Sequence, residues 1–251
     1  MTDLSMLARR LESAQAQLNE RLNAAAGGSS LSVGGGFAHF RGPGHPLNQA
    51  LGLTAPITEL ELEAVEKFLG SPTVLELSPG ADGELWALLS RRGYRVHQFQ
   101  QLWVRHLAGY SPEEDTDGVR IVRADEAEEY SRLIGAGFSD QQDWRAYEPP
   151  FKTSLDVAGT FGFIVSFGDE PAGGGLVGVV DGVALLAGDA VLPQFRGRGL
   201  QKKLVHARLR TAVELGCDVA CAGTAPSTAS QRSYEACGFR VAYPKLELAR
   251  G

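Results

Sequence analysis

The chain has 251 residues, of which 43% are hydrophobic and 22% are charged, a composition typical of globular proteins. Thirty acidic residues against 24 lysines and arginines give a net charge of −6, which opposes general binding to nucleic acid. No apolar run approaches the roughly 20 residues that cross a bilayer, and the N-terminal segment lacks the apolar core of a signal peptide. We therefore expect a cytoplasmic protein of one or two domains, with neither nucleic acid nor membrane as a partner.

The first half of the chain predicts helices and strands in alternation. Leucines at positions 4, 7, 11, 18 and 22 have helical spacing and predict an amphipathic helix that ends near Gly27. A glycine-rich, strand-like segment follows, and "TELELEAVEKFLG" predicts a helix with Thr58 as its N-cap and a glutamate three residues on. A strand, a helix and a long strand are predicted over "TVLELS", "GELWALLSRRG" and "YRVHQFQQLWVRHL". The polar segment 111–118 is the best candidate for a linker.

After this linker, "VRIVRA" predicts a strand and "DEAEEYSRLIGAGF" a helix, while residues 139–155 contain a double proline and are expected to be irregular. Three strands then follow as a meander, "TFGFIVSF", "GGGLVGVV" and "VALLAGDAVL". The loop "QFRGRG" leads into a helix, a strand, a second helix and a last strand. The pattern predicts an α/β fold with a mostly antiparallel mixed sheet flanked by helices.

The chain also repeats itself weakly. A shift of 145 residues without a gap places "QALGLT" (49–54) on "QFRGRG" (194–199) and residues 74–96 on residues 219–241. We interpret this as two copies of one unit, a domain of residues 1–112 and a domain of residues 113–251. Opposite the two arginines of the loop the first copy has leucines, and opposite Tyr234 it has Leu89. The first domain is therefore expected to keep the fold without a cofactor, and to shape an acceptor pocket or an interface.

The loop needs a local explanation, because residues 194–210 carry six lysines and arginines and no acid. Gly197 and Gly199 allow the backbone to approach a bulky anion closely, and the start of the next helix presents unpaired N–H groups to it. This is the chemistry of pyrophosphate binding. No Gly-Lys-Ser/Thr follows, and the third glycine of the dinucleotide fingerprint is missing, so two familiar phosphate loops are excluded. A solvated basic loop is the alternative.

Two motifs resemble the GNAT acetyltransferase superfamily. Gln194, Gly197 and Gly199 after an apolar strand resemble its motif A, and Tyr234, four residues before Gly238 and a phenylalanine, resembles its closing segment. The resemblance covers about residues 119–248. It implies acetyl-CoA as co-substrate, a small-molecule or peptide amine as acceptor, direct transfer without a metal, and tandem GNAT-like domains of which only the second is active.

The resemblance also implies roles by position. Peptide N–H groups of the loop would hold the pyrophosphate, and the edge of the preceding strand would pair with the pantetheine arm. Two serines of the last helix would contact the cofactor, although superfamily members often carry an asparagine there. The expected cofactor-binding residues are thus Val191, Leu192, Gln194, Arg196, Gly197, Arg198, Gly199, Leu200, Ser230 and Ser233.

Two residues are candidates for proton transfer. Tyr234 is the candidate acid for the departing thiolate, because a phenol stays protonated at neutral pH, and the alternative is that it packs a helix on the sheet. Asp189 is the candidate base, unless it is a solvated or structural carboxylate. Three acids of the irregular segment would attract a cationic acceptor or simply face water: Asp140, Asp143 and Glu148.

The remaining reactive residues point to no second chemistry. Cys217, Cys221 and Cys237 lack the further ligands that a zinc site needs, so we interpret them as small buried thiols. His206 is expected on the surface or lining a groove. A non-catalytic acyl-CoA-binding sensor or scaffold is the alternative function, and the acceptor, the base and the oligomeric state stay open.

Overall fold

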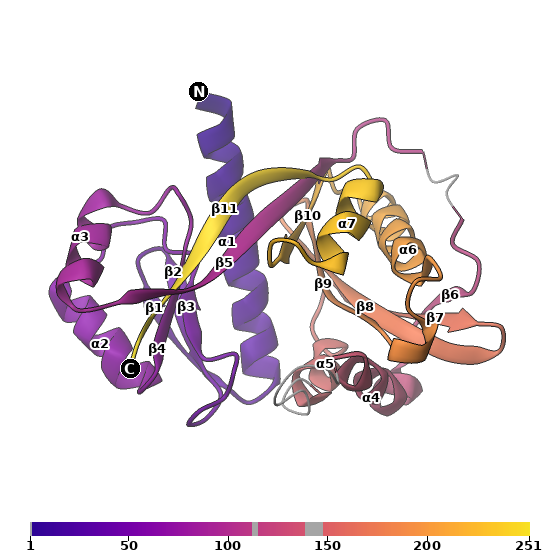
Figure 1. Cartoon of the computed structure of the whole chain (residues 1–251), viewed down its shortest axis with the longest axis horizontal. Helices are drawn as coiled ribbons and strands as arrows, with labels where there is room; N and C mark the ends of the chain where they lie inside the picture. The colour runs from indigo at the N-terminus through magenta and orange to yellow at the C-terminus, as the bar shows by residue number, and fades with distance from the viewer. Residues whose placement is uncertain (1, 112–114, 139–147) are drawn as a thin grey trace. The chain divides into compact units, whose positions relative to one another are not determined.

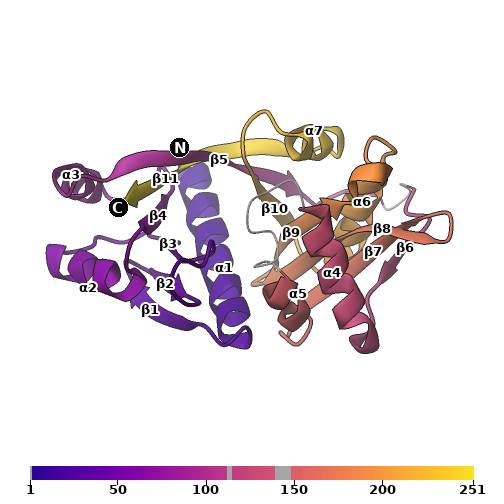
Figure 2. The same cartoon turned by 60° about the horizontal axis from the view of Figure 1, so that its bottom comes forward.

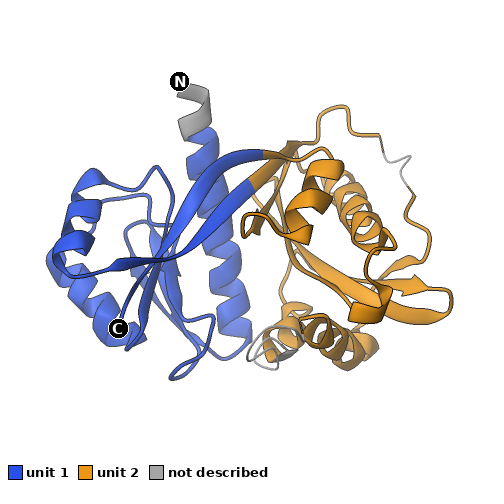
Figure 3. Cartoon of the chain, in the orientation of Figure 1, with its two compact units in different colours: residues 1–102, 241–251 blue, residues 103–240 orange. Residues whose placement is uncertain are grey.

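The computed structural model describes residues 2–111, 115–138 and 148–251, and for residues 2–5 and 148 it describes the backbone alone (Figures 1 and 2). The chain divides into unit 1, residues 1–102 with 241–251, and unit 2, residues 103–240 (Figure 3). Unlike the consecutive domains expected from the sequence, unit 1 takes the last strand, because β11 (Arg240–Arg250) pairs antiparallel with β4 (Thr73–Leu77). Hydrophobic spacing predicts that strand, but it does not say which sheet the strand joins.

Unit 1 is a mixed sheet with helices on both faces. Its strand order is β1-β2-β3-β4-β11-β5, in which β3 and β4 are parallel and the pairs β1/β2, β2/β3 and β4/β11 are antiparallel. Its further elements are α1 (Thr2–Ala25), β1 (Ser29–Val33), β2 (Gly36–Phe40), β3 (Gln49–Leu51), α2 (Glu59–Leu69), α3 (Gly83–Arg91) and β5 (Arg95–His106), whose last residues belong to unit 2.

Strand β4 shows how the sequence produces two faces. Leu75 and Leu77 pack in the core that also holds buried leucines of α2 and α3. Glu76 between them lies on the opposite face, where its carboxylate accepts a hydrogen bond from Gln15 of α1 at 3.4 Å. Alternate residues of a strand point to opposite faces, so this sequence places α1 on one side of the sheet and α2 with α3 on the other.

Helix α2 begins as the sequence predicts. Thr58 is its N-cap: the Thr58 hydroxyl oxygen accepts from the Glu61 N–H at 3.3 Å, and the Glu61 carboxylate accepts from the Thr58 N–H at 2.7 Å. This capping box satisfies N–H groups that would otherwise face solvent or a ligand. The predicted cap is confirmed.

The gapless repeat is wrong at its first segment. Residues 49–51 form strand β3, in which Ala50 lies opposite Leu75, whereas Gln194 lies in a 3-10 turn after a strand has ended. The residue that precedes α2, as Gly199 precedes the corresponding helix of unit 2, is therefore Thr58. A short gap shifts the register here, and only the later part of the repeat keeps the order strand, helix, strand without one.

Unit 2 has the strand order β5-β10-β9-β8-β7-β6, with β9 and β10 parallel and the pairs from β9 to β6 antiparallel. Its mixed, mostly antiparallel sheet with flanking helices confirms the predicted fold class. In the described part of the chain, no helix is long and apolar enough to cross a membrane. The elements are β6 (Val119–Ile121), η1 (Ala124–Glu126), α4 (Ala127–Gly137), α5 (Glu148–Ser154), β7 (Thr160–Phe167), β8 (Glu170–Val180), β9 (Val183–Val191), η3 (Pro193–Phe195), α6 (Leu200–Glu214), β10 (Val219–Thr224) and α7 (Ala229–Ala236).

Alternation again sets the layers of unit 2. Ile164 of β7 packs with Tyr130 and Ile134 of α4, while Phe163 and Val165 pack in the core that includes the buried leucines of α6. Figure 1 shows α4 and α5 on one side of these strands and α6 on the other. Helix α5 falls where the sequence predicts an irregular segment; its two prolines occupy the first turn, where a missing N–H costs nothing.

A buried histidine in unit 1 predicts a pH dependence of stability. His39 is 3% exposed, and burial together with the charge of Arg41 lowers its pKa from 6.5 to about 4. The folded state thus binds fewer protons than the unfolded chain between these values, so stability is fully present above pH 6.5 and is lost as the pH falls toward 4. Between pH 7 and pH 4 the free energy of unfolding should fall by about 2 to 3 kcal/mol less in His39→Gln than in the wild type, as measured by urea unfolding at both pH values. An equal pH dependence in both proteins would contradict this assignment.

Candidate active site

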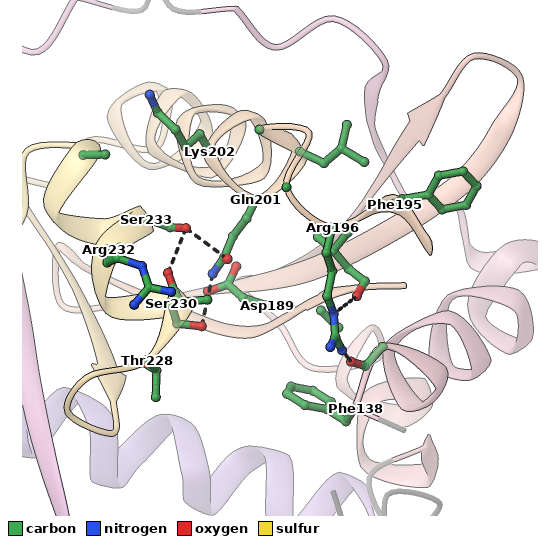
Figure 4. Close-up of a pocket in the computed structure, with 18 residues that line it drawn as sticks. Phe138, Asp189, Phe195, Arg196, Gln201, Lys202, Thr228, Ser230, Arg232 and Ser233 are labelled. Carbon is green, nitrogen blue, oxygen red and sulfur yellow. Dashed lines mark hydrogen bonds between the residues drawn. The ribbon is translucent and has the colours of Figure 1, made fainter. Parts of the chain in front are cut away.

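A cavity of about 540 Å³ opens beside the first turn of α6, near the carboxyl ends of the parallel strands β9 and β10 (Figure 4). Among the residues predicted to bind cofactor, Val191, Arg196, Gly197, Gly199, Leu200, Ser230 and Ser233 line it, whereas Leu192, Gln194 and Arg198 do not. The other residues that line the cavity, none of them predicted to bind the cofactor, are Gly137, Phe138, Asp189, Ala190, Phe195, Gln201, Lys202, Thr228, Ala229, Arg232 and Ala236.

The loop at the mouth of this cavity turns on two glycines. Gly197 and Gly199 both have φ of 77°, in the left-handed region that glycine adopts without strain. Gly199 is the N-cap of α6 and has no side chain to accept from the first turn; the first helical bonds run from the Lys202 and Lys203 N–H groups to Gly199 O, at 3.0 and 3.3 Å. No described residue accepts from the N–H groups of the two residues in between. The start of α6 is therefore open to an anion.

The two arginines of the loop serve different purposes. The Arg196 guanidinium donates to Val191 O at 3.1 Å and to Gly137 O at 2.9 Å, so it braces the loop against β9 and the end of α4. Arg198 instead lies over the ring of Phe167, 4.4 Å from its centroid. The mobile positive charges on the cavity wall are those of Lys202 and Arg232, both exposed, and Arg232 was missed by sequence reasoning.

Gln201 ties the first turn of α6 to α7. Its amide nitrogen donates to Ser230 Oγ at 3.2 Å, and its amide oxygen accepts from Ser233 Oγ at 3.1 Å (Figure 4). The two predicted serines therefore reach the cavity wall, where they already have a partner. Helix α7 begins beside them with Thr228 as its N-cap, accepting from the Gln231 N–H at 3.2 Å.

Strand β9 contains a β-bulge next to the cavity. Leu176 of β8 lies opposite Ala187 and Gly174 lies opposite Ala190, so β9 has one residue more than β8 between these pairs. Gly188 makes the bulge with φ of 67°, and the Phe151 ring fills the place where a Cβ would lie. Beyond the bulge the pairing of β9 with β10 has ended. The extra residue turns Asp189 away from the regular alternation of the strand.

Asp189 is held by two buried groups. One carboxylate oxygen accepts from Arg208 of α6, and the other accepts from the hydroxyl of Tyr234 of α7. Arg208 is 0% exposed and also donates to Leu204 O at 3.0 Å and to Leu176 O at 3.1 Å. Burial alone would lower the pKa of Arg208, but the Asp189 carboxylate raises it above its usual range. Arg208 therefore stays charged and links α6 to both strands of the bulge.

Tyr234, the predicted acid, stands behind Asp189 rather than on the cavity wall. Its side chain is 1% exposed and packs edge-on against Phe239, with 5.0 Å between ring centroids. Burial raises the pKa of the Tyr234 phenol well above its ordinary value, and the Asp189 carboxylate raises it further. The hydroxyl is thus a proton donor to Asp189 at neutral pH.

Room for the Arg208 guanidinium comes from Gly175, the last of three consecutive glycines of β8 that are all closely packed. A Cβ on Gly175 would lie 2.9 Å from Arg208 Nη1, and one on Gly174 would lie 2.9 Å from the Ile134 side chain on the opposite face. A Cβ on Gly173 would meet the backbone of β9. Arg208 was not predicted as a site residue. Its spacing of four from Leu204, itself four from Leu200, places it on the apolar face of the helix. A charge buried on such a face needs a partner, and this was the available signal.

Other predicted residues fall elsewhere. Asp140 and Asp143 lie outside the described residues, as does the side chain of Glu148. His206 is not a surface residue: it is 5% exposed, and its Nδ1 lies 3.2 Å from the Tyr110 hydroxyl. The three cysteines are buried, as expected, and no cluster of metal-ligating side chains occurs in the ranges that the structure covers.

The buried pair predicts a strong energetic coupling. Removing one partner leaves the other charge without compensation, so we expect Arg208→Met to cost about 3 kcal/mol of unfolding free energy. In a double-mutant cycle with Asp189→Asn, measured by urea unfolding, the coupling should reach about 2 kcal/mol. Additive effects of the two substitutions would show that the pair does not hold the bulge.

Comparison with known proteins places this site in a family. The family model "Acetyltransferase (GNAT) family" matches residues 119–239, while no curated protein matches the sequence. A GCN5-related N-acetyltransferase from Kribbella flavida superposes with a TM-score of 0.70 at 19% identity, over 96% of this chain and 95% of that one. A tandem GNAT protein from the clavulanic acid biosynthesis pathway, solved without AcCoA, superposes with a TM-score of 0.57 at 14% identity, over 89% of this chain and 78% of that one. A GCN5-related N-acetyltransferase from Sphaerobacter thermophilus superposes with a TM-score of 0.56 at 13% identity, over 76% of this chain and 64% of that one. At these identities the solved structures show a shared fold, and the family model shows that residues 119–239 are a domain of the acetyltransferase (GNAT) family.

Proposed function

We propose that unit 2 transfers an acetyl group from acetyl-CoA directly to a primary amine. The observation that carries the proposal is the open N-terminus of α6, with its two left-handed glycines, at the mouth of a 540 Å³ cavity inside the family-matched domain. Cavities of this size hold ligands of the class of a cofactor arm, and the exposed N–H groups favour a diphosphate.

The chain's own residues divide the task of holding the co-substrate. Peptide N–H groups of Leu200 and Gln201 would bind the diphosphate, with Lys202 and Arg232 adding charge from the wall. The edge of β9 at Val191, unpaired with β10 at this point, would accept the pantetheine arm as an added strand. Leu192, Gln194 and Arg198 lie outside the cavity wall, so we assign them to the shape of the loop and not to direct contact.

The chemistry requires two proton movements. The amine nitrogen forms a bond to the thioester carbonyl carbon, the carbon–sulfur bond breaks, one proton leaves the amine and one proton reaches the thiolate. Asp189 is the carboxylate that reaches the cavity, and it accepts the proton from the amine. Tyr234 lies behind Asp189 and is hydrogen-bonded to it, so the proton that reaches the thiolate passes through Asp189, and the Tyr234 hydroxyl replaces that proton on the carboxylate.

Binding at the loop can be tested with a matched pair of glycines. Gly197→Glu places a negative side chain at the proposed diphosphate site, whereas Gly216→Glu makes the same change at the other end of α6, where φ is 76° and the surroundings are equally open. By isothermal calorimetry we expect Gly197→Glu to weaken acetyl-CoA binding by about tenfold or more, because hydrogen bonds to charged groups contribute about 1.5–3 kcal/mol each. Gly216→Glu should bind as the wild type does. Equal binding by all three proteins would remove the loop from the site.

Turnover can be tested separately from binding. With a panel of primary amines and a thiol-release assay, we expect Tyr234→Phe to lower kcat by about a hundredfold and to change KM for acetyl-CoA little, as for loss of a proton donor. Asp189→Asn should lower kcat similarly. Tight acetyl-CoA binding by the wild type without turnover of any amine would contradict the enzyme and support the acyl-CoA-binding sensor.

A further inference from the structure

Unit 1 contains a cavity of its own, of about 410 Å³. It lies at the carboxyl ends of β3 and β4, which are the parallel strands of this unit, as β9 and β10 are of unit 2. Helix α1 and strand β11 form its other walls. The lining residues are Leu7, Ala8, Arg9, Glu12, Thr54, Ser78, Pro79, Gly80, Ala242 and Tyr243.

The wall of this cavity carries a buried carboxylate. Glu12 is 2% exposed; one of its oxygens accepts from the Tyr243 hydroxyl at 2.6 Å and from Lys245 Nζ at 2.9 Å. Lys245, also 2% exposed, pairs in addition with Glu76 at 2.9 Å. Glu247 lies directly opposite Glu76 in the sheet. One buried ammonium therefore serves two carboxylates, with a third beside them.

Among the described residues, this cluster holds more acidic groups than buried cations, because Lys245 pairs with both Glu12 and Glu76. Burial would lower the pKa of Lys245, but Glu76 and Glu12 raise it, so the ammonium stays charged and already has both acids as partners. A buried charge is costly unless it is paired. A further cation that enters from the cavity would meet Glu12 at its wall.

The same position in the two units carries opposite chemistry. In unit 2 the cavity faces a helix start without a side-chain cap and two exposed cations. In unit 1 the capping box of Thr58 and Glu61 satisfies the start of α2 and adds a negative charge there. Arg9, the cation on the cavity wall of unit 1, is exposed, so its charge is solvated. The wall at Glu12 therefore favours a cation.

We propose that the cavity of unit 1 binds a small primary amine with an apolar body, its ammonium group paired with Glu12. The apolar side chains of Leu7, Ala8, Pro79 and Ala242 would enclose the body of the ligand, and a volume of 410 Å³ accommodates a molecule the size of phenethylamine. This site lies wholly within unit 1 and does not depend on acetyl transfer by unit 2.

Three probes with one body and different charge test the proposal on the full-length protein: phenethylamine, 2-phenylethanol and phenylacetate. By isothermal calorimetry, with acetyl-CoA omitted, we expect the amine to bind most tightly and the carboxylate least. Protein-observed NMR should place the shifts at Ala8 and Ala242. Equal or tighter binding of the alcohol or the carboxylate, or shifts confined to unit 2, would overturn the proposal.

Variants separate charge from shape. Glu12→Gln should weaken binding of the amine by about tenfold or more and leave binding of the alcohol unchanged, because an ionic hydrogen bond contributes about 1.5–3 kcal/mol. Glu20→Gln, on the same helix but away from the cavity wall, is the matched control and should bind as the wild type does. If Glu12→Gln fails to fold, Ala242→Phe fills the cavity while the acidic and basic residues are kept, and it should abolish binding of the amine. Unchanged amine binding in Ala242→Phe would overturn the site.

Discussion

The peptide N–H groups at the start of α6 form the constraint on which the rest of the site depends. A helix normally satisfies its first turn with a side chain, as Thr58 does for α2. Gly199 offers none, and its left-handed backbone turns the loop so that the helix start lies on the cavity wall. The capping residue differs between the two helices, and this difference separates the proposed anion site from an ordinary helix terminus. The basic side chains near the loop add to this effect but do not create it.

The buried trio of Asp189, Arg208 and Tyr234 sets the second half of the site. A buried guanidinium would destabilise the fold without acceptors for its donors. The bulge of β9 supplies the Asp189 carboxylate and the Ala187 carbonyl oxygen, and β8 supplies the Leu176 carbonyl oxygen. The bulge, the ion pair and the phenol therefore depend on one another. This mutual dependence explains what fixes the orientation of the Asp189 carboxylate at the cavity wall.

The sequence predicted most elements and the position of the loop, because periodicity, glycines and caps are local signals. It did not predict that the last strand pairs within unit 1, because strand partners are chosen by tertiary packing. Residues 49–51 were misaligned because α2 has 11 residues and α6 has 15, so the part of the repeat before these helices has a different register from the part after them. Arg208 and Arg232 were missed because sequence alone does not distinguish a buried or cavity-facing arginine from a solvated one. The bulge that reorients Asp189 has no local signal except Gly188.

The three adjacent glycines of β8 have a consequence for how this protein can vary. Side chains are excluded there from both faces, by Arg208 on one side and by α4 on the other. A stretch that looks featureless in composition is thus among the least replaceable parts of unit 2, since even alanine would force a neighbour to move. Changes of side chain near this strand are therefore accommodated in the loops around it, while the strand itself stays bare.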